Sequence, residues 1–189
     1  LWNAGRIDTD LLYHNLMEVY RYGNVADPRV YVDTFVNYNF NATNIRIAFA
    51  RLGAELARRG EKEKAVEVLD YGLEQMPVSQ FQYTYQYLPY IRAYYEARAT
   101  EKGDALFDSY AKNLEEYVDY FLSFPDNRQY LIENQFADKL TALAELHRIA
   151  ENYGRTDRAA RILNLFDWLF GPEGQTDYTE YEQTVLPTE

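Results

Sequence analysis

A pattern of large and small apolar residues on both sides of Gly60 constrains this chain most strongly. Large residues and one glycine precede it at helical spacing, and an alanine, a leucine, a second glycine and a proline follow. These residues are Phe49, Leu52, Gly53, Leu56, Ala65, Leu69, Gly72 and Pro77. Apolar residues three and four positions apart share one helix face, and glycine commonly ends a helix. The pattern predicts two antiparallel helices, the first over residues 44–59.

The pattern recurs twice in weaker form. One copy is centred on Arg98, 38 residues after Gly60, and another on Gly154, 56 residues after Arg98. A helical hairpin of about 34 residues with this order resembles the tetratricopeptide repeat. The sequence therefore predicts an all-α fold, a tetratricopeptide-like right-handed stack of helical hairpins (an α-α superhelix). The hairpins are expected over residues 44–79, 84–124 and 127–170.

Three details of the hairpins follow from the residue types. Small side chains let two helices approach closely, so Gly53 and Ala65 are expected to face each other. Pro89 is expected to kink or shift the second hairpin, because proline removes a helical hydrogen bond. The long interval before Gly154 predicts helices over 101–124 and 127–153, with Asp126 as the N-cap of the second.

The two ends of the chain differ from this central part. Residues 1–43 predict a leading helix over 9–22, with Asp8 or Thr9 as N-cap and Gly23 closing it, followed by an irregular connection. Residues 172–189 predict an acidic, irregular tail, because residues 171–189 hold five acids and no basic residue.

Composition excludes several classes of function. With 19 Lys and Arg against 30 Asp and Glu, the net charge is −11, which excludes nucleic acid as the expected partner. The chain has no Cys and only His14 and His147, so thiolate chemistry, a His-rich metal site and a His-based triad are not expected. The glycine-rich phosphate and dinucleotide motifs are also missing. We expect no cofactor and no metal.

Acidic residues offer the remaining route to catalysis. Asp8-Thr9-Asp10 has the D-x-D pattern of some metal-dependent glycosyltransferases. Its position just before an apolar helix favours a role in capping that helix. Glu115 with Glu116, and Glu61 with Glu63, are interpreted as solvated helix faces, because adjacent helical residues diverge. His147, at the position equivalent to Gly53, is interpreted as structural. A helical glycosidase or transferase using surface carboxylates is the rival hypothesis.

The densest local feature is a tyrosine cluster at residues 83–95. Its simplest interpretation is a phenol layer in the core, and its functional interpretation is a sugar-stacking or peptide-binding surface. In a tetratricopeptide stack, certain first-helix positions line the ligand groove. Here they give the candidate binding residues Arg58, Tyr85, Arg92, Tyr95, Arg148 and Asn152. Three arginines on one face suit a carboxylate-bearing peptide.

A broader resemblance covers most of the chain. It rests on Asp10-Leu11-Leu12-Tyr13, Asp27-Pro28-Arg29-Val30-Tyr31-Val32-Asp33, Asn44-Ile45-Arg46, Phe49-Ala50-Arg51-Leu52, Glu63-Lys64-Ala65-Val66-Glu67-Val68-Leu69-Asp70 and Met76-Pro77. These segments resemble the C-terminal soluble region of a family of bacterial multi-spanning membrane proteins of unknown function. The membrane part of that family is distantly similar to protein O-mannosyltransferases of the GT-C class.

The resemblance implies a domain on the periplasmic face of the inner membrane, tethered by upstream transmembrane spans outside this chain. The first residue, Leu1, also indicates a piece of a longer protein. The parent is expected to transfer sugars with acids that lie elsewhere, so this fragment is expected to be non-catalytic. Its expected partners are a protein or peptide, a glycan acceptor, or the parent's membrane domain. A purely structural cap on that membrane segment is the other open hypothesis.

Overall fold

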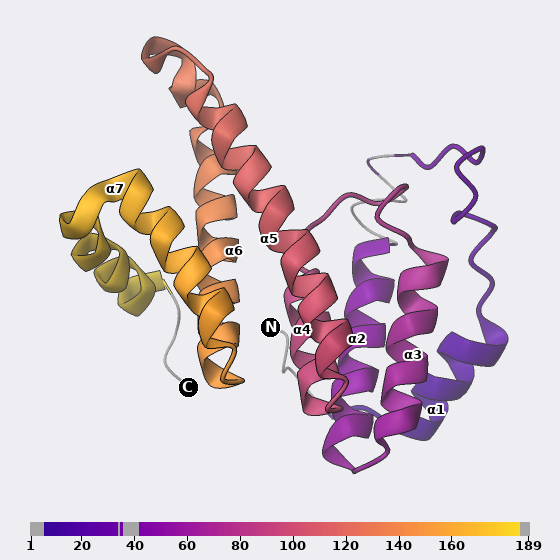
Figure 1. The fold of residues 1–189 in the computed structure, drawn as a ribbon. Helices are drawn as coiled ribbons and strands as arrows, with labels where there is room; N and C mark the ends of the chain where they lie inside the picture. The colour runs from indigo at the N-terminus through magenta and orange to yellow at the C-terminus, as the bar shows by residue number, and fades with distance from the viewer. Residues whose placement is uncertain (1–5, 34, 36–41, 186–189) are drawn as a thin grey trace. The chain divides into compact units, whose positions relative to one another are not determined.

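The structure is a computed structural model that describes residues 6–33, 35 and 42–185 (Figure 1). These residues form helices and connections with no strand, which confirms the all-α prediction. The elements are α1 (Thr9–His14), a π-helical turn (Asn15–Val19), α2 (Thr43–Arg58), α3 (Lys62–Gln75), α4 (Tyr87–Glu96), α5 (Thr100–Leu122), a 3₁₀-helix (Asp126–Leu131), α6 (Glu133–Asn152) and α7 (Thr156–Val185). The chain forms two compact units that divide within α5, after Asn113.

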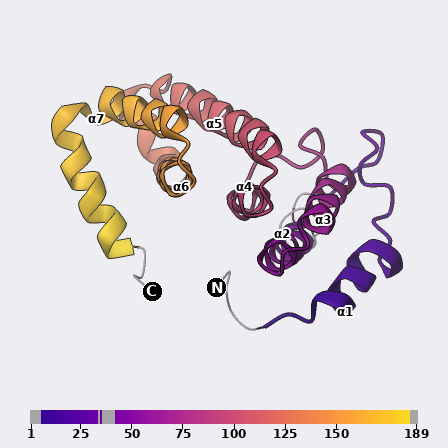
Figure 2. The same cartoon turned by 60° about the horizontal axis from the view of Figure 1, so that its bottom comes forward.

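In the first unit, α2 packs against both α3 and α4 (Figures 1 and 2). Their apolar stripes meet because each helix repeats large residues at intervals of three and four. Leu16 of the π-helical turn joins the same core. The buried members of this core are Leu16, Ala42, Phe49, Ala50, Leu52, Leu56, Ala57, Ala65, Val68, Leu69, Met76, Phe81, Tyr90, Ala93, Tyr94 and Ala97.

All three predicted turn centres adopt the left-handed conformation, with φ of 86° at Gly60, 61° at Arg98 and 66° at Gly154. At each turn, the amide of the residue with positive φ donates a hydrogen bond to the carbonyl three residues earlier. The amide of the following residue donates to the carbonyl five residues earlier. The six bonds are Gly60 to Ala57, Glu61 to Leu56, Arg98 to Tyr95, Ala99 to Tyr94, Gly154 to Glu151 and Arg155 to Ala150, at 2.7–3.0 Å. This is the Schellman pattern that closes a helix. The predicted positions of the three turns are confirmed.

Gly53 faces a larger residue than expected. A Cβ added to Gly53 would lie 2.7 Å from the Leu69 side chain, so the glycine accommodates a large residue of α3. Ala65 is fully buried in the same core. Small against large, instead of small against small, fills the space between two close helices without a void.

Pro89 does not kink a helix. Helix α4 begins at Tyr87, which places Pro89 in its first turn. Amides of the first turn have no carbonyl partner within the helix, so proline costs no hydrogen bond there. The prediction was wrong because it started the helix too early.

The leading helix is shorter than predicted. Asp8 is the N-cap, and its carboxylate accepts from the Leu11 amide at 3.0 Å, which confirms the capping interpretation. The helix then widens into the π-helical turn and ends at Val19, where the Tyr20 amide bonds the Asn15 carbonyl at 2.9 Å. Gly23 lies in a later turn and does not close the helix.

The second unit holds the end of α5, the 3₁₀-helix, α6 and α7. The predicted helix over 127–153 is wrong at its start, because α6 begins at Glu133 with Ile132 as its N-cap. Asp126 instead begins the 3₁₀-helix that follows Pro125. Proline restricts the residue before it and cannot donate a helical hydrogen bond, so the chain reverses here through a tighter turn.

Helix α6 packs against α7 and against the end of α5 (Figure 1). Phe121 and Phe136 stack with ring centroids 3.7 Å apart. The guanidinium of Arg161 donates two hydrogen bonds to Glu115, from Nε at 2.8 Å and from Nη2 at 2.7 Å. The other buried apolar residues are Leu114, Val118, Ala142, Leu143, Ala144, Leu146, Ile149, Ala150, Ala159, Ile162 and Phe166.

The predicted irregular tail is helical through most of its length. Helix α7 runs to Val185, interrupted at Gly171, which has φ 68° and ψ 177°. Pro172 follows this break, and proline is well suited to the first position of a new helical segment. Residues 186–189 of the predicted tail lie outside the described part of the chain.

Candidate functional site

The predicted groove residues are distributed over both units. Arg58, Tyr85, Arg92 and Tyr95 belong to the unit that ends at Asn113. They lie at the end of α2, just before α4, and within α4. The remaining two, Arg148 and Asn152, belong to α6 of the second unit, where Asn152 is the last helical residue.

Two of the predicted arginines are paired with glutamates on their own helices. Arg58 lies 2.5 Å from a carboxylate oxygen of Glu55. Arg148 donates two hydrogen bonds to Glu145, at 2.9 and 2.8 Å. Both pairs have the i, i+3 spacing that helices favour. Each carboxylate offsets the positive charge that was expected to attract an acidic peptide.

The two tyrosines of the predicted groove differ in exposure. Tyr95 is only 7% exposed, and its hydroxyl bonds Asp104 of α5 at 2.9 Å. Its ring also fills the space beside Gly103. Tyr85 is 53% exposed in the turn before α4, while Arg92 in the middle of α4 is partly buried. Tyr85 is therefore the groove tyrosine that offers an aromatic face to solvent.

The rest of the tyrosine cluster is mainly core. Tyr87, Tyr90 and Tyr94 are buried, and Tyr83 stacks on Tyr110 with centroids 5.4 Å apart. This arrangement confirms the simpler interpretation, a phenol layer inside a helical unit. Sugar stacking needs exposed ring faces, and these buried rings do not provide them.

Arg46 is the main structural residue that sequence reasoning missed. It is 2% exposed, and it donates hydrogen bonds of 3.2 Å to the carbonyls of Met76 and Phe81. Its guanidinium also lies 4.7 Å from the centroid of the Tyr87 ring. The cation thus joins α2, the end of α3 and the start of α4. Its sequence signal was weak, because arginine at the start of a helix is usually exposed.

Burial changes the acidity of the central tyrosines. The pKa of Tyr90 is raised above its ordinary value, mainly by complete burial and despite the nearby Arg46 charge. The pKa of Tyr94 is also raised, by burial and by the hydrogen bond to Asp70 at 2.8 Å. The Tyr90 hydroxyl has no hydrogen-bond partner within the described residues. Both phenols stay neutral in the folded protein.

Two of the carboxylates weighed for catalysis have partners in the structure. Glu115 is held by Arg161 of α7, and Glu61 lies 3.8 Å from Lys64. Glu115 therefore links two helices and does not simply face solvent as expected. The pKa of Asp27 is lowered by hydrogen bonds from Arg29, which lies in the same exposed connection.

The two histidines lie in different units. His14 pairs with Glu18 at 2.8 Å on the surface of the first unit. His147 of α6 is largely buried, with Nδ1 3.8 Å from a Glu151 oxygen. Its Nε2 has no hydrogen-bond partner within the described ranges. Within those ranges no group of three or more His, Asp or Glu side chains is arranged to hold a metal ion.

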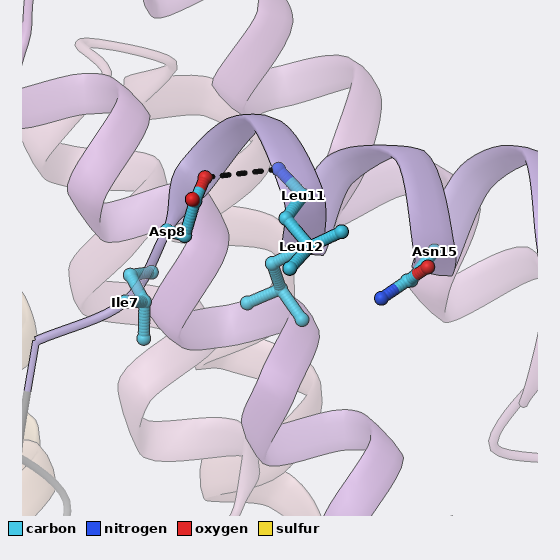
Figure 3. A pocket seen from close by; sticks show the side chains of 5 residues that line it. All are labelled: Ile7, Asp8, Leu11, Leu12 and Asn15. Carbon is cyan, nitrogen blue, oxygen red and sulfur yellow. Dashed lines mark hydrogen bonds between the residues drawn. The ribbon is translucent and has the colours of Figure 1, made fainter.

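A shallow depression follows one face of α1 (Figure 3). It is lined by Ile7, Asp8, Leu11, Leu12 and Asn15, and its volume is about 220 Å³. The sequence did not predict this depression, because Leu12 and Leu16 mark the apolar face of the helix and the depression also includes residues outside that face. The signal that was present is Leu11, an apolar residue off that face and four positions before Asn15.

The described residues form an all-helical fold in which Gly60, Arg98 and Gly154 each close a helix with a Schellman turn. No helix in the described part of the chain is both long and apolar enough to span a membrane. Comparison of the chain with protein-family models, with curated proteins and with solved structures finds no match.

Proposed function

We propose that this chain is a non-catalytic docking domain: a tetratricopeptide-like right-handed stack of helical hairpins that binds a protein, a peptide or a glycan acceptor. The observation that carries the proposal is the shared geometry of the turns at Gly60, Arg98 and Gly154. The same turn at equivalent positions is what a tandem of hairpin repeats requires. Stacked hairpins present extended surfaces for binding.

The packing of α2 supports this proposal within the first unit. Helix α2 contacts its hairpin partner α3 and also α4, the first helix of the next hairpin. In a tetratricopeptide stack, first helices of successive hairpins lie side by side in this way and form the binding face. The predicted binding residues Arg58, Tyr85 and Arg92 belong to or directly precede these first helices.

Recognition on this face is proposed to depend on Tyr85 more than on charge. Tyr85 exposes about half of its surface, whereas the charges of Arg58 and Arg148 are offset by Glu55 and Glu145. Tyrosine and arginine are enriched among the residues that dominate binding energy at protein interfaces. Tyr85 and Arg92 are therefore the first residues to test, with Arg148 and Asn152 of the second unit next.

The parent protein and the location are proposed from the resemblance alone. The domain would follow the last membrane span of a GT-C-like glycosyltransferase and face the periplasm. An acidic chain with net charge −11 fits this proposal, because it is unsuited to nucleic acid and suited to a protein partner.

A photo-cross-linking experiment in cells tests the proposed function. A photoreactive phenylalanine analogue would replace Tyr85, and the products would be identified by mass spectrometry. We expect a cross-link to a second protein, and we expect it to disappear when Arg92→Ala is added. The matched control places the analogue at Tyr31, which is 84% exposed in the connection before α2.

Two results would contradict the proposal. Cross-links confined to the parent chain would favour the structural cap. Turnover of a sugar substrate by the purified fragment alone would favour the enzyme hypothesis.

A further inference from the structure

The depression on α1 is a second surface, separate from the helices discussed above. Leu11 and Asn15 lie four residues apart on the helical stretch, and Ile7 lies in the non-helical segment just before the N-cap, Asp8 (Figure 3). Leu11 is 57% exposed, although leucine gains free energy when it is buried. The described part of the chain does not cover this leucine.

The size of the depression indicates what kind of group fits it. Its volume is about 220 Å³. One water occupies about 30 Å³ in the liquid. Small-molecule sites usually measure about 300–1,000 Å³. The depression is therefore better matched to one or two side chains of a partner than to a cofactor.

The polar groups of the depression lie at its two ends. Oδ1 of Asp8 accepts the capping hydrogen bond from the Leu11 amide. Within the described residues, the second oxygen of Asp8 and the side-chain amide of Asn15 have no hydrogen-bond partner. The middle is apolar, formed by Ile7, Leu11 and Leu12. A lysine or arginine side chain has the matching form, an aliphatic stem with a cationic end.

The charges around the depression favour a cationic partner. Asp8, Asp10 and Glu18 carry negative charge on this stretch. Arg6 opposes them, and His14 pairs with Glu18. The Arg21 guanidinium is turned onto the carbonyls of Glu18, Val19 and Tyr20. The whole chain has a net charge of −11. Basic partners are therefore attracted at long range, and self-association of this face is opposed.

We propose that the depression binds a partner segment in which a Lys or Arg lies next to an apolar residue. The cationic end pairs with the second oxygen of Asp8, and the apolar neighbour covers Leu11. This proposal is independent of the face that carries Tyr85, since its residues are different and its variants can be tested separately.

Fluorescence anisotropy with a defined probe tests the proposal. The probe is a fluorescein-labelled peptide of alternating Lys and Leu with Gly at both ends, added to the full chain. Leu11→Ser should weaken binding about 10-fold, because it removes roughly 1.4 kcal/mol of apolar contact. Asp8→Asn should weaken it about 3-fold, the size expected for an exposed ion pair. Amide NMR spectra should show the largest peptide-induced shifts at Leu11, Leu12 and Asn15.

The charge control is built into the same helix. Asparagine is as good an N-cap as aspartate, so Asp8→Asn removes the charge and keeps the capping bond. Asp10→Asn removes an equal charge that does not line the depression, and it should leave binding nearly unchanged. A peptide with Ser in place of Leu should bind at least 10-fold more weakly than the probe.

Three outcomes would overturn the proposal. The first is no saturable binding of the probe. The second is an equal loss for Asp8→Asn and Asp10→Asn, which would mean non-specific attraction to an acidic protein. The third is a dimer in sedimentation that Leu11→Ser dissociates, which would make a second copy of the chain the occupant. None of these affects the cross-linking test at Tyr85.

Discussion

The α2–α3 hairpin and the α4–α5 hairpin reach the same turn with different residues. Both close with the same pair of backbone hydrogen bonds, and both place a residue with positive φ at the centre of the turn. That residue is Gly60 in the first hairpin and Arg98 in the second. Backbone bonding therefore sets the turn, and glycine only makes it less costly.

Close approach of the helices is also achieved in two ways. In the first hairpin a side chain is missing on each helix, because Gly53 of α2 accommodates Leu69 and Gly72 of α3 accommodates Phe49. In the second hairpin the missing side chain is on α5, where Gly103 accommodates Tyr95. What is kept between the two hairpins is the combination of one absent and one large side chain, since the core must fill without gaps.

The first helices differ in their buried residues as well. Helix α2 buries Phe49, Leu52 and Leu56, whereas α4 buries Tyr87, Tyr90 and Tyr94 at the equivalent positions. Three hydroxyl groups thus enter the second hairpin. They require partners, and the Tyr90 hydroxyl has none within the described residues. Only the second hairpin should therefore respond to high pH through these positions.

The largest expected effect comes from filling either glycine. Gly53→Val and Gly103→Val should each lower the free energy of unfolding by about 2–3 kcal/mol, because a Cβ would lie 2.7 Å from Leu69 or Tyr95. Urea denaturation measures this loss. Ala54→Ser is the control, since it changes a neighbouring residue of α2 without adding a branched side chain and should cost only about 0.5 kcal/mol of helix propensity.

A crossed rescue sharpens this comparison. Leu69→Ala should recover part of the loss caused by Gly53→Val but none of the loss caused by Gly103→Val. Tyr95→Ala should do the reverse. Additive effects in both combinations would show that neither glycine accommodates the side chain we assign to it.

The second expected effect is a loss of stability at high pH. Burial raises the pKa of Tyr90 and Tyr94 above the value of about 10 in an unfolded chain. A raised pKa means that the protonated phenol favours the folded state. The contribution of each protonated phenol to the free energy of unfolding is complete below pH 10. It falls as pH rises further, by about 1.4 kcal/mol per pH unit for each tyrosine. Denaturation midpoints between pH 9 and 11 should show this slope.

A double variant identifies the source of that slope. Tyr90→Phe with Tyr94→Phe should reduce it clearly, because phenylalanine does not ionise. At neutral pH, Tyr94→Phe should cost about 1 kcal/mol through the lost bond to Asp70. A slope that is the same in the double variant and the parent chain would assign the alkaline transition to other groups.

The smallest expected effect is at the turns. Arg98→Gly should stabilise the protein by about 0.5–1 kcal/mol, because glycine adopts positive φ without the steric cost that other residues incur. The opposite change, Gly60→Arg, should cost about 1–2 kcal/mol. Thermal denaturation of the two variants measures both. Destabilisation by Arg98→Gly would mean that the exposed Arg98 side chain makes a contribution larger than its backbone strain.

Much of the fold was predictable from local pattern. Helical periodicity predicted the all-α class, and the three turn centres lie at the expected residues because turn closure depends on nearby backbone groups. Helix starts were less predictable. Helix α4 begins at Tyr87 and α6 begins at Glu133, in each case after a turn. The spacing of apolar residues does not show where such a turn ends. The helical segment after Gly171 was missed because acidic composition was taken to indicate irregular structure.

The candidate site was predicted less completely. Repeat position indicated Tyr85 and Arg58 as exposed residues, but the same rule included Tyr95, which is buried against α5. Burial depends on what the next helix places opposite, and this requires the tertiary contact between Tyr95 and Gly103. Sequence alone also gave no reason to expect the Arg46 guanidinium inside the core.

The sequence by itself determined the class of secondary structure, the positions of the three reversals and the acidic character of the protein, because each depends on residues close together in the chain or on composition. The tertiary structure alone decided that Gly53 accommodates Leu69, that Arg46 is enclosed by the Met76 and Phe81 carbonyls, and that Leu11 faces solvent. These features depend on side-chain volume and burial between helices distant in sequence, and no local pattern encodes them.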